Sequence, residues 1–288
     1  MIKPNLAAFL CAPPPGAAPV QVATARHFPV LFLSDLHLGS RACRADDLLS
    51  FLHRHTADTI YLVGDIVDTW TATSAAQWTA AQHSILQLLL DRARNGTRLI
   101  YTPGNHDAFF RQYCAQRVAG IEIVSHILHH AADGRRYLVI HGDVCDIFDA
   151  RFPYLARIGA KVESLFRGLG HRVNALRRRF GRPEWAIVDR VLHRANDLIR
   201  CVDEFDRRLA DLARAHGTDG IICGHFHKPA LHSDHGIAYA NCGDWVENST
   251  ALAETASGRL LLLDWAPHAQ DNRARAPRPH LGAAARGI

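Results

Sequence analysis

The sequence lacks the features that mark membrane-spanning, disulfide-stabilised or zinc-ribbon proteins. It contains no run of about 18 apolar residues, so no transmembrane helix is predicted. Its seven cysteines form an odd, irregularly spaced set without a Cys-x-x-Cys pair, which argues against a disulfide framework and against a zinc ribbon. No internal repeat is evident. We therefore expect reduced thiols in a cytoplasmic protein.

Charge is also modest. Charged residues make up 21% of the 288 residues and the formal net charge is +5, with much of the excess between Arg151 and Arg182. Apolar residues make up 48%, enough to bury a sizeable core in one large domain or in one domain with an insertion. Histidine, in contrast, is plentiful at 19 residues.

The chain divides into four kinds of segment. Residues 1–27 are predicted to be a disordered leader, because their short apolar patch is interrupted by three prolines from Pro13 and is too short for a secretory signal. Residues 28–147 and 201–265 form the predicted core. Residues 148–200 are predicted to be a helical, basic insertion, and residues 266–288, rich in Ala, Pro and Arg, a flexible tail.

Within the core, strands and helices alternate early and strands dominate late. Helices are expected where apolar residues recur at helical spacing, over residues 46–55, 75–94 and 197–215. Short apolar runs predict strands over residues 29–34, 60–63, 98–101, 121–128, 136–140, 220–223, 237–241 and 259–265. This order predicts two packed sheets flanked by helices, an α/β (α+β) arrangement.

Metal-binding side chains follow five of these strands. The motifs are Asp35-x-His37, Gly64-Asp65, Gly104-Asn105-His106-Asp107, His141-Gly142-Asp143 and Gly224-His225-Phe226-His227. Each motif alone is also compatible with solvated acids or surface histidines, but the whole order is difficult to obtain by chance. We hypothesise that the strand tips converge on two metal ions, with Asp65 bridging them. Asp68 either supports this site from behind or starts a turn.

In this order the motifs resemble the calcineurin-like metallophosphoesterase family over residues 28–264. The resemblance implies an αββα two-sheet sandwich with a dinuclear centre. It assigns the first metal to Asp35, His37 and His227, the second to Asn105, His141 and His225, and the bridge to Asp65. The mixed nitrogen and oxygen ligands favour two divalent ions, Mn²⁺ first and Fe or Zn²⁺ as alternatives.

The resemblance also implies an activity. Metal-hydroxide attack on a phosphate ester or diphosphate proceeds without a covalent enzyme intermediate at such a centre. His106 is implied to face the substrate oxygen, with Asp107 orienting its imidazole. A non-catalytic scaffold of the same fold is the remote alternative, and it predicts missing ligands; none of the expected ligands is missing from the sequence.

Three further segments resemble the UDP-2,3-diacylglucosamine diphosphatase branch of the family: Ile66 to Trp70, Cys223 to Pro229 and Asn241 to Glu247. That branch cleaves a lipid A precursor to 2,3-diacylglucosamine 1-phosphate and UMP. Its best-known members carry Arg where this chain has His106, which implies a divergent group. Another nucleotide-sugar, a nucleotide or a phosphoprotein is the alternative substrate.

The predicted insertion has the pattern of a basic amphipathic helix, which is typical of a surface that meets acidic head groups or a lipid tail. An ordinary packed helix with a solvated basic face is the alternative. In the branch, a helical lid at this position receives acyl chains, so candidate substrate-binding residues are Arg151, Phe152, Arg157, Lys161, Phe166 and Lys228. We expect a lipid-linked nucleotide-sugar substrate, no nucleic acid, no obligate protein partner, and a cytoplasmic location with peripheral contact to the inner membrane as an option.

Overall fold

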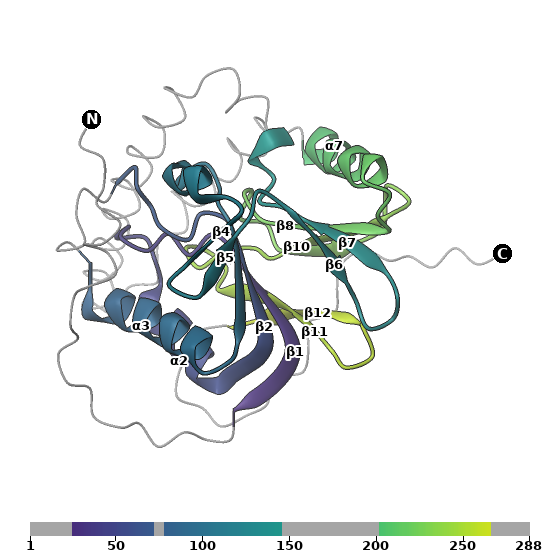
Figure 1. Ribbon diagram of the computed structural model, residues 1–288. Helices are drawn as coiled ribbons and strands as arrows, with labels where there is room; N and C mark the ends of the chain where they lie inside the picture. Colours follow the sequence, from purple (N-terminus) through teal and green to yellow (C-terminus); the bar gives the residue numbers. More distant parts are fainter. Residues whose placement is uncertain (1–24, 72–77, 146–201, 266–288) are drawn as a thin grey trace, which may run out of the picture.

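The computed structural model describes residues 25–71, 78–145 and 202–265. In this part of the chain, two sheets pack face to face (Figure 1). One has seven strands in the order β12-β11-β1-β2-β3-β5-β4, and the other has five in the order β6-β7-β8-β10-β9.

The centre of each sheet is parallel. In the seven-stranded sheet, β1, β2, β3 and β5 run parallel, and the remaining strands pair antiparallel at the edges. In the five-stranded sheet, β8 lies parallel to both β7 and β10. The strands of the larger sheet are β1 (Arg26–Leu33), β2 (His55–Val63), β3 (Arg98–Thr102), β4 (Gln116–Val118), β5 (Ile121–Ile123), β11 (Thr250–Glu254) and β12 (Leu260–Asp264). Those of the smaller sheet are β6 (Ile127–His130), β7 (Arg136–Val139), β8 (Gly220–Cys223), β9 (Ala230–His232) and β10 (Ala238–Asn241).

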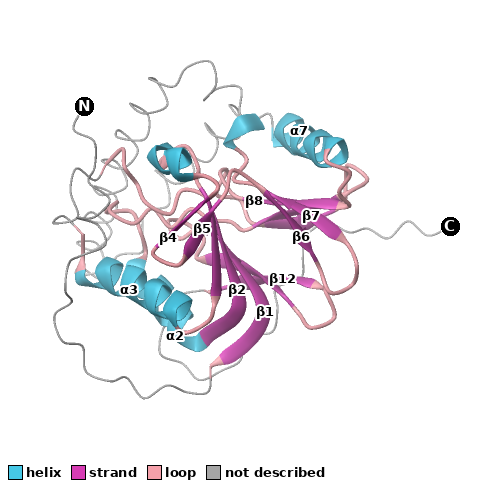
Figure 2. Ribbon diagram, in the orientation of Figure 1, coloured by secondary structure: helices cyan, strands magenta, loops and turns pink. Residues whose placement is uncertain are grey.

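Helices cover the two outer faces. The helices α2 (Ala45–Arg54) and α3 (Ala80–Arg94) lie against the larger sheet, and α7 (Val202–Ala215) lies against the smaller one (Figure 2). Two 3-10 turns, η2 (Ala108–Tyr113) and η3 (Asp143–Cys145), follow β3 and β7. The predicted αββα sandwich is confirmed.

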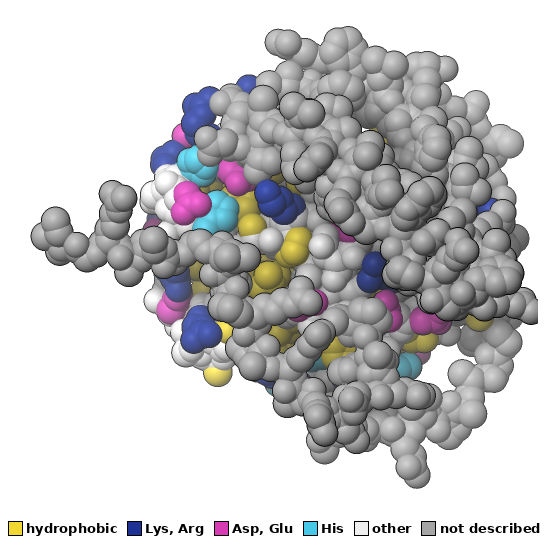
Figure 3. Space-filling view, turned by 180° about the vertical axis from the view of Figure 1, so that it is seen from behind, with side chains coloured by type: hydrophobic (Ala, Val, Ile, Leu, Met, Phe, Trp, Pro, Cys, Tyr) yellow, Lys and Arg dark blue, Asp and Glu magenta, His cyan; other side chains and the backbone are white. Residues whose placement is uncertain are grey.

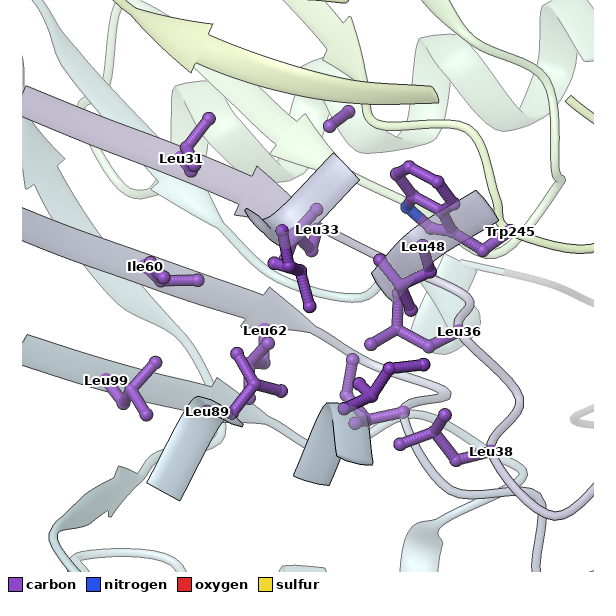
Figure 4. Close-up of a cluster of buried hydrophobic side chains, with 14 of the residues drawn as sticks. Leu31, Leu33, Leu36, Leu38, Leu48, Ile60, Leu62, Leu89, Leu99 and Trp245 are labelled. Atoms are coloured by element: carbon purple, nitrogen blue, oxygen red, sulfur yellow. The ribbon is translucent and has the colours of Figure 1, made fainter. Parts of the chain in front are cut away.

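Alternating side chains on the central strands build the core. Leu31 and Leu33 on β1 face the helices, where they join Ile60, Leu62, Leu99, Leu48 and Leu89 (Figure 4). The intervening side chains of the same strands face the second sheet and pack on it; they are Val30, Phe32, Tyr61, Val63 and Ile100. Because side chains alternate along a strand, apolar residues at every position fill both interfaces at once.

The first residue of α3 differs from the prediction. The helix begins at Ala80 rather than residue 75, because Thr79 and Gln82 form a reciprocal capping box. Trp78, which we expected on the helix, precedes it and is nevertheless buried. Residues 72–77 lie outside the described part of the chain.

The segment predicted as one strand over residues 121–128 is two strands in different sheets. β5 ends at Ile123, and the chain then crosses to the smaller sheet, where β6 begins at Ile127. The strands β4, β9 and β11 were not predicted. For β11 the reason is its composition, Thr-Ala-Leu-Ala-Glu, since Ala and Glu have low strand propensity.

Of the predicted segment boundaries, only the one between the leader and the core lies within the described residues. β1 begins at Arg26, so the last two residues of the predicted leader belong to a core strand. The insertion over residues 148–200 and the tail over residues 266–288 lie outside the described residues and stay predictions. None of the helices in the described ranges has the length and apolar character needed to cross a bilayer.

Candidate metal centre

All seven predicted metal ligands follow the carboxyl ends of parallel strands. Those after β1, β2 and β3 come from the larger sheet, and those after β7 and β8 come from the smaller one. They are Asp35, His37, Asp65, Asn105, His141, His225 and His227. Because the carboxyl ends of parallel strands meet at one edge of a sheet, the two sheets present these side chains to the same place.

Five of these residues have a left-handed backbone conformation. The φ angles are 53° at Asp35, 48° at His37, 53° at Asp65, 74° at His225 and 53° at His227. Non-glycine residues rarely adopt positive φ, and such conformations persist where the surroundings enforce them, often at functional sites. Hydrogen bonds between the loops supply that restraint here, for example from the N–H of Asp35 to the carbonyl of Gly64 at 3.0 Å.

Two glycines allow the loops to approach one another. A Cβ at Gly104 would lie 2.6 Å from Nε2 of His141 and would also overlap the carboxylate of Asp65. A Cβ at Gly224 would overlap the side chains of Ser34 and Asp35. The glycines in the Gly-Asn-His-Asp and Gly-His-Phe-His motifs are therefore required by close contact with ligand side chains.

The first group of donors consists of Asp35, His37 and His227. Nε2 of His37 lies 3.2 Å from Nε2 of His227, and Oδ1 of Asp35 lies 3.3 Å from Nε2 of His227 and 3.8 Å from Nε2 of His37. Oδ1 of Asp35 is buried and accepts no hydrogen bond from any described residue. Three donor atoms around one point, one of them an unsatisfied carboxylate oxygen, fit a divalent cation.

The second group consists of Asp65, His141 and His225, whose donor atoms lie within 4.8 Å of one another. Nε2 of His141 is 3.4 Å from Oδ2 of Asp65 and 3.3 Å from Oδ1 of Asn105. Nδ1 of His141 donates to the carbonyl of Val63 at 3.0 Å, which leaves Nε2 to face the group.

Asp65 belongs to the second group, and its carboxylate also lies close to the first. Its Oδ2 is 3.4 Å from Nε2 of His141 in the second group and 3.9 Å from Nε2 of His37 in the first. Its Oδ1 accepts a hydrogen bond from the N–H of His106 at 2.9 Å. This position fits a carboxylate that contacts two ions.

Electrostatics favour positive charge at this site. Burial by itself raises the pKa of Asp65, but the charges of His141 and His106 outweigh it and hold the pKa well below its usual range. Burial lowers the pKa of His227, and the opposing carboxylates of Asp35 and Asp244 raise it to about 9. Ionised buried acids require compensation, which protons or metal ions on these donors provide.

His106 lies beside the first group and contacts Asp68. Its Nδ1 is 3.3 Å from Oδ1 of Asp68, and its ring stacks on Trp70 with centroids 3.8 Å apart. Burial lowers the pKa of the imidazole, but the carboxylates of Asp65 and Asp68 outweigh burial and raise the pKa above its ordinary value. Asp68 also starts a turn, because its Oδ1 accepts from the N–H groups of Trp70 and Thr71, both at 3.0 Å, so the structure shows both roles that the sequence left open for it.

Asp107 occupies a different place from the one expected. Its Oδ2 accepts from the N–H of Ile66 at 2.7 Å and of Val67 at 3.3 Å, and its Oδ1 accepts from Gly104 at 2.6 Å. Asp107 thus joins the loops after β2 and β3, and Asp68 is the acid beside His106. Burial and the charge of Asp65 raise the pKa of Asp107 to about 6.

Most predicted substrate-binding residues cannot be placed. Arg151, Phe152, Arg157, Lys161 and Phe166 lie outside the described residues. Lys228 is exposed and directly follows His227. On the face of the molecule in Figure 3, basic, acidic and histidine side chains of the described residues lie side by side, so the visible described surface mixes both signs of charge.

Comparison with known proteins identifies relatives over most of the chain. A model of the family described as "Calcineurin-like phosphoesterase" matches residues 28–229. A protein named "UDP-2,3-diacylglucosamine hydrolase" from Pseudomonas fluorescens is 29% identical over 251 residues, which cover 83% of this chain and 97% of the relative. A protein of the same name from Pseudomonas paraeruginosa is 31% identical over 240 residues, 80% of this chain and 96% of the relative.

Proposed function

The chain belongs to the calcineurin-like phosphoesterase family, and on that basis we propose that it hydrolyses the diphosphate bond of UDP-2,3-diacylglucosamine. The products would be UMP and 2,3-diacylglucosamine 1-phosphate. The observation that carries the proposal is that the expected donor side chains lie together at one edge of the sandwich, in a chain whose named relatives align over 96–97% of their own lengths.

The proposed centre uses the two groups of donors. Asp35, His37 and His227 would hold one divalent ion, and Asn105, His141 and His225 would hold the other, with Asp65 contacting both. When bound, two such ions polarise phosphoryl oxygens and make water more acidic. The hydrogen bond from His141 to Val63 keeps its metal-facing nitrogen in place, and the left-handed loops hold the remaining donors.

His106 is the proposed proton or hydrogen-bond donor to the oxygen of the reacting phosphate. Asp68 faces Nδ1 of its imidazole, so Nε2 is the nitrogen available to the substrate. Trp70 covers one face of the ring and limits its rotation. A positioned general acid of this type contributes roughly 10²–10⁴-fold to the rate.

The part of the proposal that concerns the lipid rests on sequence. Lys228 is a candidate contact for the diphosphate because it is exposed next to a proposed metal ligand. The acyl chains are assigned to the insertion, in particular to Arg151, Phe152, Arg157, Lys161 and Phe166. A cytoplasmic location, with peripheral contact to the inner membrane, agrees with a lipid-linked substrate.

Substrate comparison tests the proposal directly. Purified protein with Mn²⁺ is assayed with UDP-2,3-diacylglucosamine, UDP-GlcNAc and an aryl phosphate, with UMP or the released phenol measured for each. We expect UMP from the acylated substrate at a rate at least about tenfold above that of the others, as one well-placed apolar contact of 1–3 kcal/mol provides. Equal rates on all three would contradict the lipid specificity. That result, or a preference for UDP-GlcNAc, would favour a different phosphate substrate.

A further inference from the structure

The turn after β10, residues 242–249, lies behind the first group of metal donors. It follows the segment matched by the family, residues 28–229, so family membership assigns it no role. Its first residues, up to Glu247, take part in the resemblance to the diphosphatase branch, which gives none of them a role. Asp244 in this turn is fully buried, and its carboxylate belongs to neither donor group.

Asp244 determines the shape of the turn. Its Oδ1 accepts hydrogen bonds from the backbone N–H groups of Val246 at 2.7 Å, of Asn248 at 3.3 Å and of Glu247. Its Oδ2 accepts from Nδ2 of Asn248 at 2.6 Å. These hydrogen bonds to one buried carboxylate hold the turn in its conformation. The position of the Asn248 side chain therefore depends on Asp244.

Asn248 links this turn to His227. The same Nδ2 donates to the carbonyl oxygen of His227 at 2.6 Å, so the two hydrogens of one amide group connect Asp244 to the metal loop. Oδ1 of Asp244 also lies 4.0 Å from Nδ1 of the His227 ring. His227 has a φ of 53°, which a non-glycine residue keeps only under restraint.

The other side of the turn is anchored in the core and on Asp35. The N–H of Trp245 donates to the carbonyl of Asp35 at 3.1 Å. The Trp245 ring is fully buried against Phe51, with centroids 5.0 Å apart, and lies beside Leu48 and Leu36 (Figure 4). The turn therefore contacts two residues of the first group.

Other elements hold the second group. His141 donates to the carbonyl of Val63, and the Asp65 carboxylate accepts from the N–H of His106. Near His225, the amide of Asn241 donates to the carbonyl of Gly224 at 2.9 Å. Loss of the contacts made by Asp244 and Asn248 would thus disturb the first group of metal donors more than the second.

We propose that Asp244 and Asn248 are positioning residues that hold His227 in place and thereby set the affinity of the first metal position. The inference rests on the proposed function, because it assumes that these donors bind metal. Residues that hold a metal ligand in its orientation typically change metal affinity by 10–100-fold when they are replaced.

Titration of Mn²⁺ into the full-length protein, followed by calorimetry and by electron paramagnetic resonance of the free ion, tests the inference. Asn248→Ala removes the donor to His227 at a half-buried position. Asp244→Asn removes the carboxylate oxygen Oδ2, which accepts the other hydrogen bond from Nδ2 of Asn248. For each variant we expect one Mn²⁺ to bind about 10–100-fold more weakly, and the other to keep its affinity within about threefold.

Glu254→Gln is the matched control. Glu254 is a buried carboxylate like Asp244, and it accepts hydrogen bonds from Ala132 N–H at 2.8 Å and from His129, away from both metal groups. This variant should lower the melting temperature and leave both Mn²⁺ affinities unchanged. If Asp244→Asn does not fold, Asn248→Ala alone decides the test.

Two results would overturn the inference, and each has a separate meaning. If Asn248→Ala binds both Mn²⁺ ions as tightly as the wild type, or if both affinities fall together, the positioning role is contradicted. Either result leaves the proposed metal centre intact. A wild-type protein that binds fewer than two Mn²⁺ ions would contradict the proposed metal centre itself.

Discussion

Replacing Asp68 by asparagine separates the charge beside His106 from the shape of the loop. Oδ1 of Asp68 accepts from the N–H groups of Trp70 and Thr71, both at 3.0 Å. The carbonyl oxygen of asparagine can accept the same two bonds, so the loop should keep its conformation. Asp68→Asn should therefore fold, and it should melt within a few degrees of the wild type.

The expected loss of activity follows from the contact between Asp68 and His106. Oδ1 of Asp68 lies 3.3 Å from Nδ1 of His106, and both side chains are largely buried. A hydrogen bond to a charged group contributes about 1.5–3 kcal/mol. Each 1.4 kcal/mol corresponds to about tenfold in rate, so kcat should fall by about 10- to 150-fold.

The pH dependence should change as well. The carboxylates of Asp65 and Asp68 raise the pKa of His106 above its ordinary value, in spite of burial. An acid catalyst is lost as the pH rises through its pKa. Because Asp68→Asn removes one of the charges that raise this pKa, the alkaline limb of the rate profile should move to lower pH.

The assay is UMP release at saturating substrate, with metal content measured on the same samples. Because Oδ2 of Asp68 also lies 3.8 Å from Nδ1 of His37, the rates are compared at saturating Mn²⁺, where Asp68→Asn should reach the metal content of the wild type. The double variant Asp68→Asn, His106→Ala should be no slower than His106→Ala, because the two residues act as one unit. Full activity in Asp68→Asn, with an unshifted pH profile, would refute this reasoning.

Three more variants test other contacts. His106→Ala should lose about 10²–10⁴-fold in kcat and keep both metal ions, measured by turnover and elemental analysis. Asp107→Ala should lower the melting temperature by several degrees in differential scanning calorimetry, because it leaves buried N–H groups unpaired at about 1–3 kcal/mol each. Gly104→Ala should lose bound metal, because its Cβ would lie 2.6 Å from Nε2 of His141; full metal content in that variant would contradict this assignment.

The sequence predicted the strands that carry the site well. Ile60 to Val63 and Ile221 to Cys223 are continuous apolar runs that end in Gly-Asp or Gly-His, and a buried parallel strand requires such runs. The strand β11 escaped prediction because it is rich in Ala, and its place beside β1 depends on long-range pairing. The crossing between β5 and β6 was not predicted because it is short, Val124 to His126, and contains no Gly or Pro to mark a break between the two strands.

The sequence predicted which residues gather at the candidate site better than it predicted the contacts that these residues make with one another. Strand-end position brings Asp35, Asp65 and His141 together, since parallel strands deliver their tips to one edge. The partner of His106 depends on which way a loop side chain points, and no periodic pattern reports that. For this reason we predicted the adjacent Asp107 as the partner, whereas the loop brings Asp68 to the imidazole.

The role of the turn after β10 was beyond prediction for a related reason. Asn248 meets the carbonyl of His227 across 21 positions of sequence, after the chain has passed through β9 and β10. Neither spacing nor composition predicts a side-chain bond to a backbone carbonyl at that distance.

The most direct test of the metal centre is anomalous diffraction from crystals of the wild-type protein grown with Mn²⁺. The proposed dinuclear centre would give two anomalous peaks about 3.5–4 Å apart, one beside Asp35, His37 and His227 and the other beside Asn105, His141 and His225, with the Asp65 carboxylate between them. A single peak, or two peaks that Asp65 does not join, would contradict it.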